Sequence, residues 1–229
     1  YNTNEKDLVI QHFKDSATAF NALKKANIEG KGVLNNRISE YLLNLLGQCG
    51  INTHLVRRLN MREQLIKKAE IVPIEFIVRN IATGSLSKRL GISEGTILEK
   101  PLLEYYLKND DLGDPIITKE HISTFEWASE KEIKIIDKMS LRINDLLQGI
   151  FRSVGIKLVD FKVEYGRVWN KNKEINEIIL ADEISPDTCR LWDIKTEKKL
   201  DKDRFRENLG NLIEAYQDVA RRLGIMPEE

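Results

Sequence analysis

KLVDFKVEY, residues 157–165, is the stretch that decides how this sequence folds. From Val159 onward every second residue is apolar, and between these residues stand Asp160, Lys162 and Glu164. Because successive side chains of a β-strand point to opposite faces, this alternation predicts a strand with one buried face. The three charged side chains would then lie in a row on the other face.

A second stretch, LADEISPDTCRLWD at residues 180–193, sets several charges directly after an apolar run that is typical of a buried strand. The end of that strand can bring Asp182 beside Glu164. Two acids held close repel each other, and one keeps its proton unless a cation lies between them. Carboxylate oxygens suit Mg²⁺, which keeps waters and shares phosphate oxygens. A solvated strand face with cross-strand ion pairs is the alternative, but the proline, tryptophan and further charges of the loop favour a ligand site.

The segment VRNIATGSLSKRLG, residues 78–91, is a candidate phosphate site. Arg79 would end a strand and Ser85 would open a short helix, where free backbone N–H groups and the helix dipole favour an anion. The segment is not a Walker A loop, which needs two spaced glycines followed by Lys-Ser/Thr. An ordinary capped helix with solvated basic residues explains it equally well.

Arg204 and Arg206 flank the apolar Phe205 and would point away from the buried side of the last helix. A planar guanidinium suits a carboxylate or a phosphate. Taken alone, simple surface charge is the better explanation of these two arginines.

The amino-acid composition limits which kinds of binding partner and which cellular compartment are expected. The 36 Lys+Arg balance 36 Asp+Glu, so the chain lacks the basic surplus of a nucleic-acid-binding protein. Cys49 and Cys189 stand far apart in no C-x-x-C pattern, which fits a reducing cytoplasm and argues against a disulfide scaffold or a structural zinc site. No apolar run approaches the ~20 residues of a membrane span, and no signal peptide is visible. We expect a cytoplasmic protein without nucleic-acid or membrane partners.

Periodicity and turn residues predict a fold of the α+β class, with strands early and helices mixed in later. Strands are predicted at 8–13, 53–58, 63–68, 72–79, 157–165 and 175–184, the last two joined by a turn with glycine and asparagine. Helices are predicted at 33–47, 84–91, 129–154 and 203–223, the third opened by the capping box at Ser129–Glu132. Residues 97–125 are expected to be mostly loop.

In this order the blocks of the chain resemble the SAICAR synthetases, the phosphoribosylaminoimidazole-succinocarboxamide synthases of purine biosynthesis, in their compact bacterial single-function form. The resemblance covers essentially the whole chain, and the GSLxKR and DExSPDxxRxWD blocks are highly specific. The blocks are FKDSATAFN (13–21), GKGVLNN (30–36), VPIEFIVRNIATGSLSKRLG (72–91), LKNDDLGDP (107–115), LVDFKVEYG (158–166), LADEISPDTCRLWD (180–193) and LDKDRFRENLGNLIEAY (200–216).

The resemblance implies both a fold and a reaction. The fold would be a small β-rich, ATP-binding N-terminal part (1–72) resembling a kinase N-lobe and a larger mixed α/β part (73–229) for substrate and metal, with the active site in the cleft. ATP, the carboxyaminoimidazole ribonucleotide and L-aspartate would give the succinocarboxamide ribonucleotide, ADP and phosphate. A carboxylate is a poor acyl donor, so an acyl phosphate is the expected intermediate. Such transfer needs positioning and charge neutralisation, which fits the absence of a nucleophile motif. The family is usually homodimeric.

The resemblance implies roles for individual residues, each at the position of this sequence that matches the family pattern. Glu164 and Asp182 would hold Mg²⁺. The catalytic set is Lys162, Asp160 and Arg190, with Lys162 neutralising the substrate carboxylate or the transferred phosphoryl group. Substrate would be held by Arg79, Ser85, Lys108, Asp114, Asp187, Arg190 and Arg206, with Ser85 on the ribonucleotide phosphate and Asp187 fixing Arg190 or a ribose hydroxyl. ATP would be held by Lys67, Glu70 and Ile71 together with Glu164 and Asp182, its adenine against residues 63–68 and 70–72.

One departure concerns the start of the family pattern, a Gly-Lys-Ala-Lys hairpin over the ATP phosphates followed by a tyrosine. Tyr1 matches that tyrosine, and the hairpin is absent from this sequence. Either the sequence is truncated there or a flexible segment was not observed. A protein truly lacking the hairpin is expected to bind ATP poorly and to react orders of magnitude more slowly, since each ~1.4 kcal/mol is tenfold in rate.

Two other functions stay open at this point. One is a different ATP-dependent ligase or a small-molecule kinase that shares the architecture; a kinase would not depend on aspartate. The other is a catalytically inactive nucleotide sensor or interaction module, which would form no ADP.

Overall fold

The computed structural model of the chain describes residues 1–19, 24–170 and 174–226. The last two residues of the block at 13–21 and part of the turn expected between 165 and 175 lie outside the described residues.

The fold is organised around one large antiparallel sheet, and its central strand is β10, Ile156–Trp169. The strand order is β11-β10-β7-β8-β9, and β12 and β6 also pair with β10. The strand predicted at 157–165 is confirmed and runs on to Trp169. The other strands of this sheet are β6 (Glu70–Ile71), β7 (Ile74–Ile81), β8 (Ile97–Leu107), β9 (Ile116–Ile117), β11 (Ile175–Ala181) and β12 (Cys189–Asp193).

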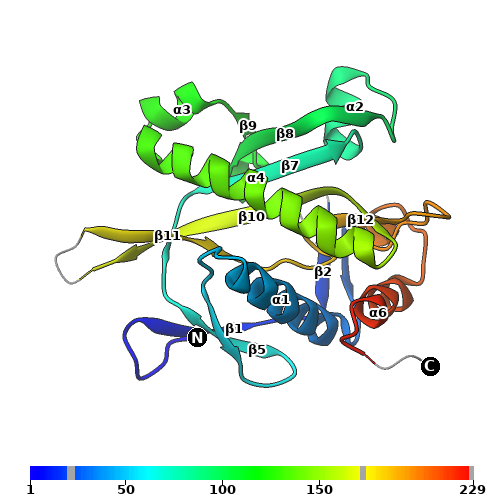
Figure 1. The fold of residues 1–229 in the computed structure, drawn as a ribbon, viewed down its shortest axis with the longest axis horizontal. Helices are drawn as coiled ribbons and strands as arrows, with labels where there is room; N and C mark the ends of the chain where they lie inside the picture. The colour runs from blue at the N-terminus through cyan, green and yellow to red at the C-terminus, as the bar shows by residue number, and fades with distance from the viewer. Residues whose placement is uncertain (20–23, 171–173, 227–229) are drawn as a thin grey trace.

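The N-terminal region forms a smaller sheet with the order β1-β5-β4 and a separate hairpin, β2–β3. Figure 1 shows the smaller sheet at the bottom of the view, below the large sheet. The strands predicted at 8–13, 53–58 and 63–68 are confirmed as β1, β4 and β5, whereas the hairpin was not predicted. The bounds are β1 (Leu8–His12), β2 (Ser16–Ala19), β3 (Lys24–Asn27), β4 (Leu55–Arg58) and β5 (Glu63–Lys67).

Two long helices cover the sheets with apolar faces. Helix α4 (Glu130–Ser153) lies across the large sheet (Figure 1), and its predicted capping box is present: the Glu132 backbone N–H donates to the Ser129 hydroxyl, and the Ser129 N–H donates to the Glu132 carboxylate. Helix α1 (Lys31–Gln48) begins two residues before the predicted start, after Gly30 in the left-handed region. Both helices join one core with the buried side of β10. This mixture of antiparallel sheets and helices confirms the α+β class.

The prediction that residues 97–125 are mostly loop is wrong. The segment contains the 11-residue strand β8, the strand β9, a 3₁₀ turn (Asp110–Leu112) and helix α3 (Lys119–Thr124). The proline at position 101 cannot donate a backbone hydrogen bond, but β9 pairs with β8 only at Tyr105 and Tyr106, so Pro101 stands on an edge where a missing N–H is tolerated.

The single last helix predicted at 203–223 is also wrong in part. The structure has α5 (Asp203–Arg206) and α6 (Leu212–Arg222) instead. Between them Asn208, Gly210 and Asn211 have φ of 59°, 69° and 50°, a left-handed conformation that ends a right-handed helix. The short helix α2 (Gly84–Leu90) is confirmed at its predicted place.

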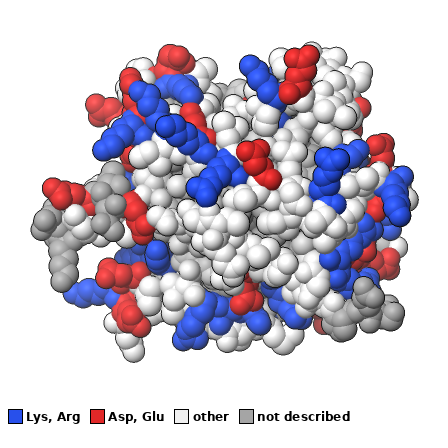
Figure 2. Space-filling model, viewed as in Figure 1, with Lys and Arg blue, Asp and Glu red and all other residues white. Residues whose placement is uncertain are grey.

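The surface carries charges of both signs. Figure 2 shows lysine and arginine interspersed with aspartate and glutamate on the face of Figure 1. Within the described ranges, no helix is both long enough and apolar enough to cross a membrane.

His54 is a buried residue at the contact between the N-terminal region and β11. Its backbone N–H donates to the carbonyl of Leu180 at 2.8 Å, and the Leu180 N–H donates to the carbonyl of Asn52 at the same distance. The imidazole is 2% exposed, and burial lowers its pKa to about 4.

This burial makes stability fall in mild acid. Below pH 6.5 the unfolded chain protonates His54 while the folded chain does not, so the free energy of unfolding should fall by roughly 3 kcal/mol between pH 6.5 and 4 from this group alone. Urea unfolding at pH 7, 5.5 and 4 measures it in the wild type and in His54→Gln. The variant should lose less stability over this range; an equal loss in both proteins would contradict the account.

Candidate active site

A pocket of about 370 Å³ opens on the charged face of β10. It gathers side chains from β7, β10, β12, the helices α2 and α5, and the segments after β11 and before α5. Eight of the residues predicted for the site line it: Arg79, Ser85, Asp160, Lys162, Asp182, Asp187, Arg190 and Arg206. Stretches more than 100 residues apart in the sequence therefore meet at one place.

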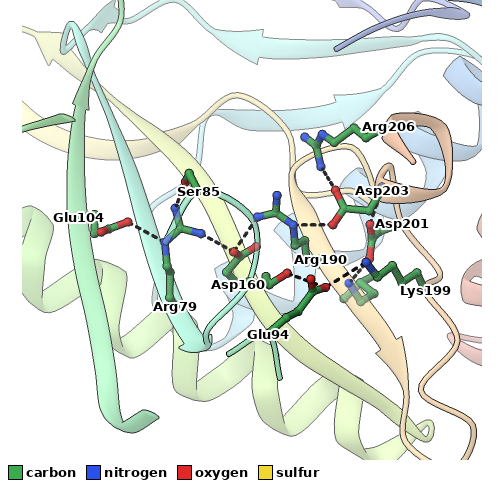
Figure 3. Close-up of polar contacts among 12 residues, drawn as sticks. Arg79, Ser85, Glu94, Glu104, Asp160, Arg190, Lys199, Asp201, Asp203 and Arg206 are labelled. Carbon is green, nitrogen blue, oxygen red and sulfur yellow. Dashed lines mark hydrogen bonds and ion pairs between the residues drawn. The ribbon is translucent and has the colours of Figure 1, made fainter. Parts of the chain in front are cut away.

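A chain of alternating charges forms one wall of the pocket (Figure 3). Arg79 donates to Glu104 at 2.6 Å and to Asp160 at 2.7 Å. Arg190 donates to the same Asp160 oxygen, Oδ2, at 2.8 Å and to Asp203 at 2.7 Å. Arg206 completes the chain by donating to Asp203 at 2.6 Å.

Strand register explains why this chain forms. Asp160 of β10 lies opposite Arg79 of β7 on one side and opposite Arg190 of β12 on the other. Arg79 is 1% exposed, and a buried guanidinium is tolerated only with close acids. Burial alone would lower the pKa of Arg190, but the charges of Asp160 and Asp203 outweigh it and raise that pKa. The arginines are therefore fixed cations before any ligand arrives.

Gly84 lets Arg190 approach the start of α2. A Cβ at this position would lie 2.7 Å from Nη2 of Arg190, and the glycine has a φ of +56°. The helix has no side-chain cap, and the hydroxyl of Ser85 accepts from Nη2 of Arg79 at 3.0 Å. Ser85, Arg79 and Arg190 thus converge here, more closely than in an ordinary capped helix on the surface.

A lysine and three carboxylates form a cluster beside these arginines. Lys162, Glu75 and Asp182 line the pocket, whereas Glu164, which is 3% exposed, does not. The Lys162 ammonium lies 2.7 Å from Glu75, 3.5 Å from Glu164 and 3.9 Å from Asp182. Burial alone would lower the pKa of Lys162, but these three acids outweigh it and raise that pKa. Burial, and then the charge of Glu164, raises the pKa of Asp182 to about 6. The predicted juxtaposition of Glu164 and Asp182 is present, with Lys162 as the cation between them and Lys108 bonded to Glu164.

The donor set can be compared with the predicted Mg²⁺ site. Within residues 1–19, 24–170 and 174–226, no three or more His, Cys, Asp or Glu side chains are grouped as a set able to hold a metal ion. Glu164 and Asp182 nevertheless fit Mg²⁺, because this ion is usually bound by one or two carboxylates and completed by water and phosphate oxygens.

The remaining predicted residues do not line this pocket: Lys67, Glu70, Ile71, Lys108, Asp114 and Glu164. Asp114 accepts from the backbone N–H of Asn109 at 2.8 Å and closes a turn. Lys67 pairs with Glu177 at 3.3 Å, and Glu70 accepts from Arg167 at 3.0 Å. Lys67 and Glu70 line a second pocket, of about 560 Å³, whereas Ile71 does not.

Gly166 brings the segment before β7 against β10. Ile71 pairs with Gly166, and a Cβ on Gly166 would lie 2.6 Å from that of Ala69. By strand alternation Gly166 continues the face that carries Lys162 and Glu164. One strand face therefore runs from the charged pocket to the segment expected to read adenine.

Comparison with known proteins settles the family. The family model described as SAICAR synthetase matches residues 1–223. The chain belongs to the SAICAR synthetase family. It is 66% identical over 229 residues to the phosphoribosylaminoimidazole-succinocarboxamide synthase of Pelagibacter ubique, covering 100% of this chain and 87% of that protein.

Solved structures of SAICAR synthetases agree with the fold. The synthase of Ehrlichia chaffeensis has a TM-score of 0.96 at 51% identity, covering 100% of this chain and 95% of that one. A type-2 SAICAR synthetase in complex with ADP has a TM-score of 0.92 at 44% identity, covering 99% and 95%. These relatives span nearly the whole chain, so the family resemblance is confirmed.

Sequence reasoning missed the acids that hold the cations. Glu104 holds Arg79, Asp203 holds Arg190 and Glu75 holds Lys162. Glu75 gave a signal, because it interrupts an apolar run on a predicted strand; Glu104 gave none, because its segment was expected to be loop. Asp187 was expected to fix Arg190 or a ribose hydroxyl. In the structure it is bonded to Lys31, which was also missed, instead of Arg190, and the ribose contact stays a prediction.

The two arginines near the end of the chain also differ from each other. Arg206 lines the pocket, whereas Arg204 donates to the carbonyls of Gly210 and Leu209 and braces the break between α5 and α6. Surface charge is therefore the wrong explanation for Arg204, which is buried.

Gly84→Ala tests the contact with Arg190, and Gly91→Ala is its matched control. Gly91, at the other end of α2, has a φ of +66° but nothing within 4 Å of an added Cβ. Both variants should lose about 1 kcal/mol of unfolding free energy from left-handed strain. Gly84→Ala should lose about 1–3 kcal/mol more, because Arg190 cannot yield without weakening its ion pairs. Urea unfolding measures both; equal losses would refute the close packing.

Proposed function

We propose that this chain catalyses the SAICAR synthetase reaction, the ATP-dependent ligation of L-aspartate to the carboxylate of the carboxyaminoimidazole ribonucleotide. The products are the succinocarboxamide ribonucleotide, ADP and phosphate. The observation that carries the proposal is a family match over residues 1–223 together with a pocket in which fixed arginines adjoin a lysine–carboxylate cluster. The ADP complex of a 44% identical relative supports ATP as the phosphoryl donor.

The pocket suits activation of a carboxylate by phosphoryl transfer. Anionic reactants repel one another, and transfer through an acyl phosphate depends on positioning and on neutralised charge. Lys162, held by Glu75 and flanked by Glu164 and Asp182, is a fixed cation beside the reacting groups. No protein nucleophile is required. Cys189 is unsuited to that role, since burial raises the pKa of its thiol.

The arginine wall suits the ribonucleotide. Ser85, Arg79 and Arg190 would contact its phosphate, and Arg206 would add a further anion contact. Asp160, predicted as a catalytic residue, already accepts from Arg79 and Arg190 through one oxygen. Its contacts favour a role in holding these two arginines in place.

Mg²⁺ would be held by Glu164 and Asp182. When bound, it neutralises phosphate charge and orients the transferred group. The adenine would lie at the second pocket, near Lys67, Glu70 and Ile71. Because Arg167 pairs with Glu70 and stands five residues after Lys162, β10 separates the adenine end from the reacting end by about 16 Å.

Lys108 and Asp114 are assigned to the aspartate or nucleotide region, and Lys108 already reaches Glu164. We likewise propose the homodimer, the cytoplasmic location and the division at residues 72 and 73.

Release of ADP by the purified protein tests the function. Mg-ATP, the ribonucleotide and L-aspartate are supplied together, and each is then omitted in turn. The chain is assayed beside one extended by a Gly-Lys-Ala-Lys hairpin at its N-terminus. ADP release that needs all three reactants supports the ligase. Release without aspartate would point to a kinase, and no release from either protein would leave a binding module.

Asp182→Asn tests the metal assignment. The amide removes a negative charge from the proposed Mg²⁺ ligands, so kcat should fall by about 100-fold or more and more Mg²⁺ should be needed for half-maximal rate. Asp145→Asn, at an exposed position of α4, is the matched control and should behave as wild type. Steady-state rates over a Mg²⁺ series measure both. Near-normal turnover with unchanged Mg²⁺ dependence in Asp182→Asn would overturn the assignment.

A further inference from the structure

Asp187 is held from two sides by residues outside the pocket. Lys31, the first residue of α1, donates from Nζ to Oδ2 at 2.6 Å. Tyr216, in α6, donates from its hydroxyl to Oδ1 at 2.5 Å. Lys31 is 4% exposed and Tyr216 is 0% exposed. We call Lys31, Asp187 and Tyr216 the clamp.

The clamp anchors the loop that joins β11 to β12. This loop, residues 182–188, begins with Asp182 and ends two residues before Arg190, and both side chains line the pocket. Helix α1 contacts the loop at a second point, where the Ile184 N–H donates to the hydroxyl of Ser39 at 3.2 Å. Two helices distant in sequence thus fix a loop that carries Asp182 and leads directly into the strand that carries Arg190.

Charge makes the clamp a strong constraint. Burial alone would raise the pKa of Asp187, but the positive charges of Lys202 and Lys31 outweigh it and lower that pKa. Burial and the Asp187 charge raise the pKa of Tyr216, which therefore remains a donor. Removing one partner of a buried ion pair leaves the other charge uncompensated, so the loop must move or admit water.

We propose that Lys31 is a positioning residue of the ligation reaction: together with Tyr216 it fixes Asp187, and through the loop it sets where Asp182 and Arg190 stand in the pocket. Neither Lys31 nor Tyr216 lines the pocket, whereas Asp187 does, so the two act through Asp187. The inference rests on the proposed function for its kinetic consequence, but the placement of the loop can be measured without it.

Removing the clamp contacts should impair catalysis beyond its effect on stability. Lys31→Met keeps an unbranched apolar stem and removes the ammonium, and Tyr216→Phe removes only the hydroxyl. We expect kcat/KM for the ribonucleotide to fall about 10- to 100-fold in Lys31→Met, because small misplacements of reacting groups are costly, and less in Tyr216→Phe. Lys31→Arg keeps the charge and should recover part of the loss.

Tyr165→Phe is the matched control. Tyr165 is also 0% exposed, and its hydroxyl bonds to that of Ser140 at 2.7 Å on the core side of β10. This variant also loses a buried tyrosine hydrogen bond but leaves the clamp intact. Its partner is a neutral hydroxyl, whereas Asp187 is a charged acceptor, so Tyr165→Phe should lower Tm less than Tyr216→Phe while keeping kcat/KM within about twofold of wild type.

The experiment measures Tm, steady-state kinetics well below Tm, and crystal structures of the wild type, Lys31→Met and Tyr216→Phe. Impaired kinetics with a shifted loop in the clamp variants, but not in Tyr165→Phe, supports the proposal. Wild-type kinetics in folded Tyr216→Phe, or an equal loss in Tyr165→Phe, overturns it. If the wild type does not ligate, the proposed function fails separately, and an unmoved Asp182 and Arg190 in the variant structures then overturns the positioning role as well. Tyr216→Phe carries the test if Lys31→Met does not fold.

Discussion

One carboxylate oxygen, Oδ2 of Asp160, holds two guanidinium groups in the interior of the pocket wall. Much of the structure follows from it. Arg79 and Arg190 come from strands on opposite sides of β10, so the ion pairs exist only if β10 lies between β7 and β12 in the observed register. A shift of one residue would turn Asp160 to the core and leave two cations without their common partner. The order of the strands in the sheet and the placement of charge in the pocket therefore depend on each other.

The other residues on the charged face of β10 also position distant parts of the chain. Asp160 organises the arginines, Lys162 separates Glu164 from Asp182, and Gly166 admits the segment before β7. Each of these positions contacts a different part of the chain. A ligase that must bring anionic reactants together needs fixed positive charge whose own desolvation is already balanced, and the alternating acids supply that balance. Preorganisation of this kind requires no mobile catalytic group.

Local patterns could predict a large part of this fold. Alternation identified β10, the capping box identified the start of α4, and the apolar stripe identified α1, because each signal lies within a few residues of the element that it describes. The prediction was wrong for β8, where Pro101 is tolerated only because that stretch is an edge, and for the last helix, which is broken by left-handed Asn208 and Asn211. Edge position and left-handed backbone depend on tertiary contacts that no short pattern contains.

The candidate site was likewise predicted only in part. The charged residues of the strands and loops could be singled out from their own stretches of sequence, and the family resemblance supplied roles for them. The partners that hold them were missed, since Glu104 and Lys31 reach the site only through pairings between distant segments. Asp187 shows the consequence: the family resemblance implied Arg190 or a ribose hydroxyl as its partner, whereas the folded chain gives it Lys31 and Tyr216.

The most direct measurement is a crystal structure of the protein with the ribonucleotide and Mg-ADP bound. The account predicts the ribonucleotide phosphate on Ser85 and Arg190, Mg²⁺ on Glu164 and Asp182, and Asp160 still bonded to both Arg79 and Arg190. A ribonucleotide bound elsewhere, or an Asp160 released from the arginines to contact substrate, would contradict the claim that fixed ion pairs prepare this pocket for its ligands.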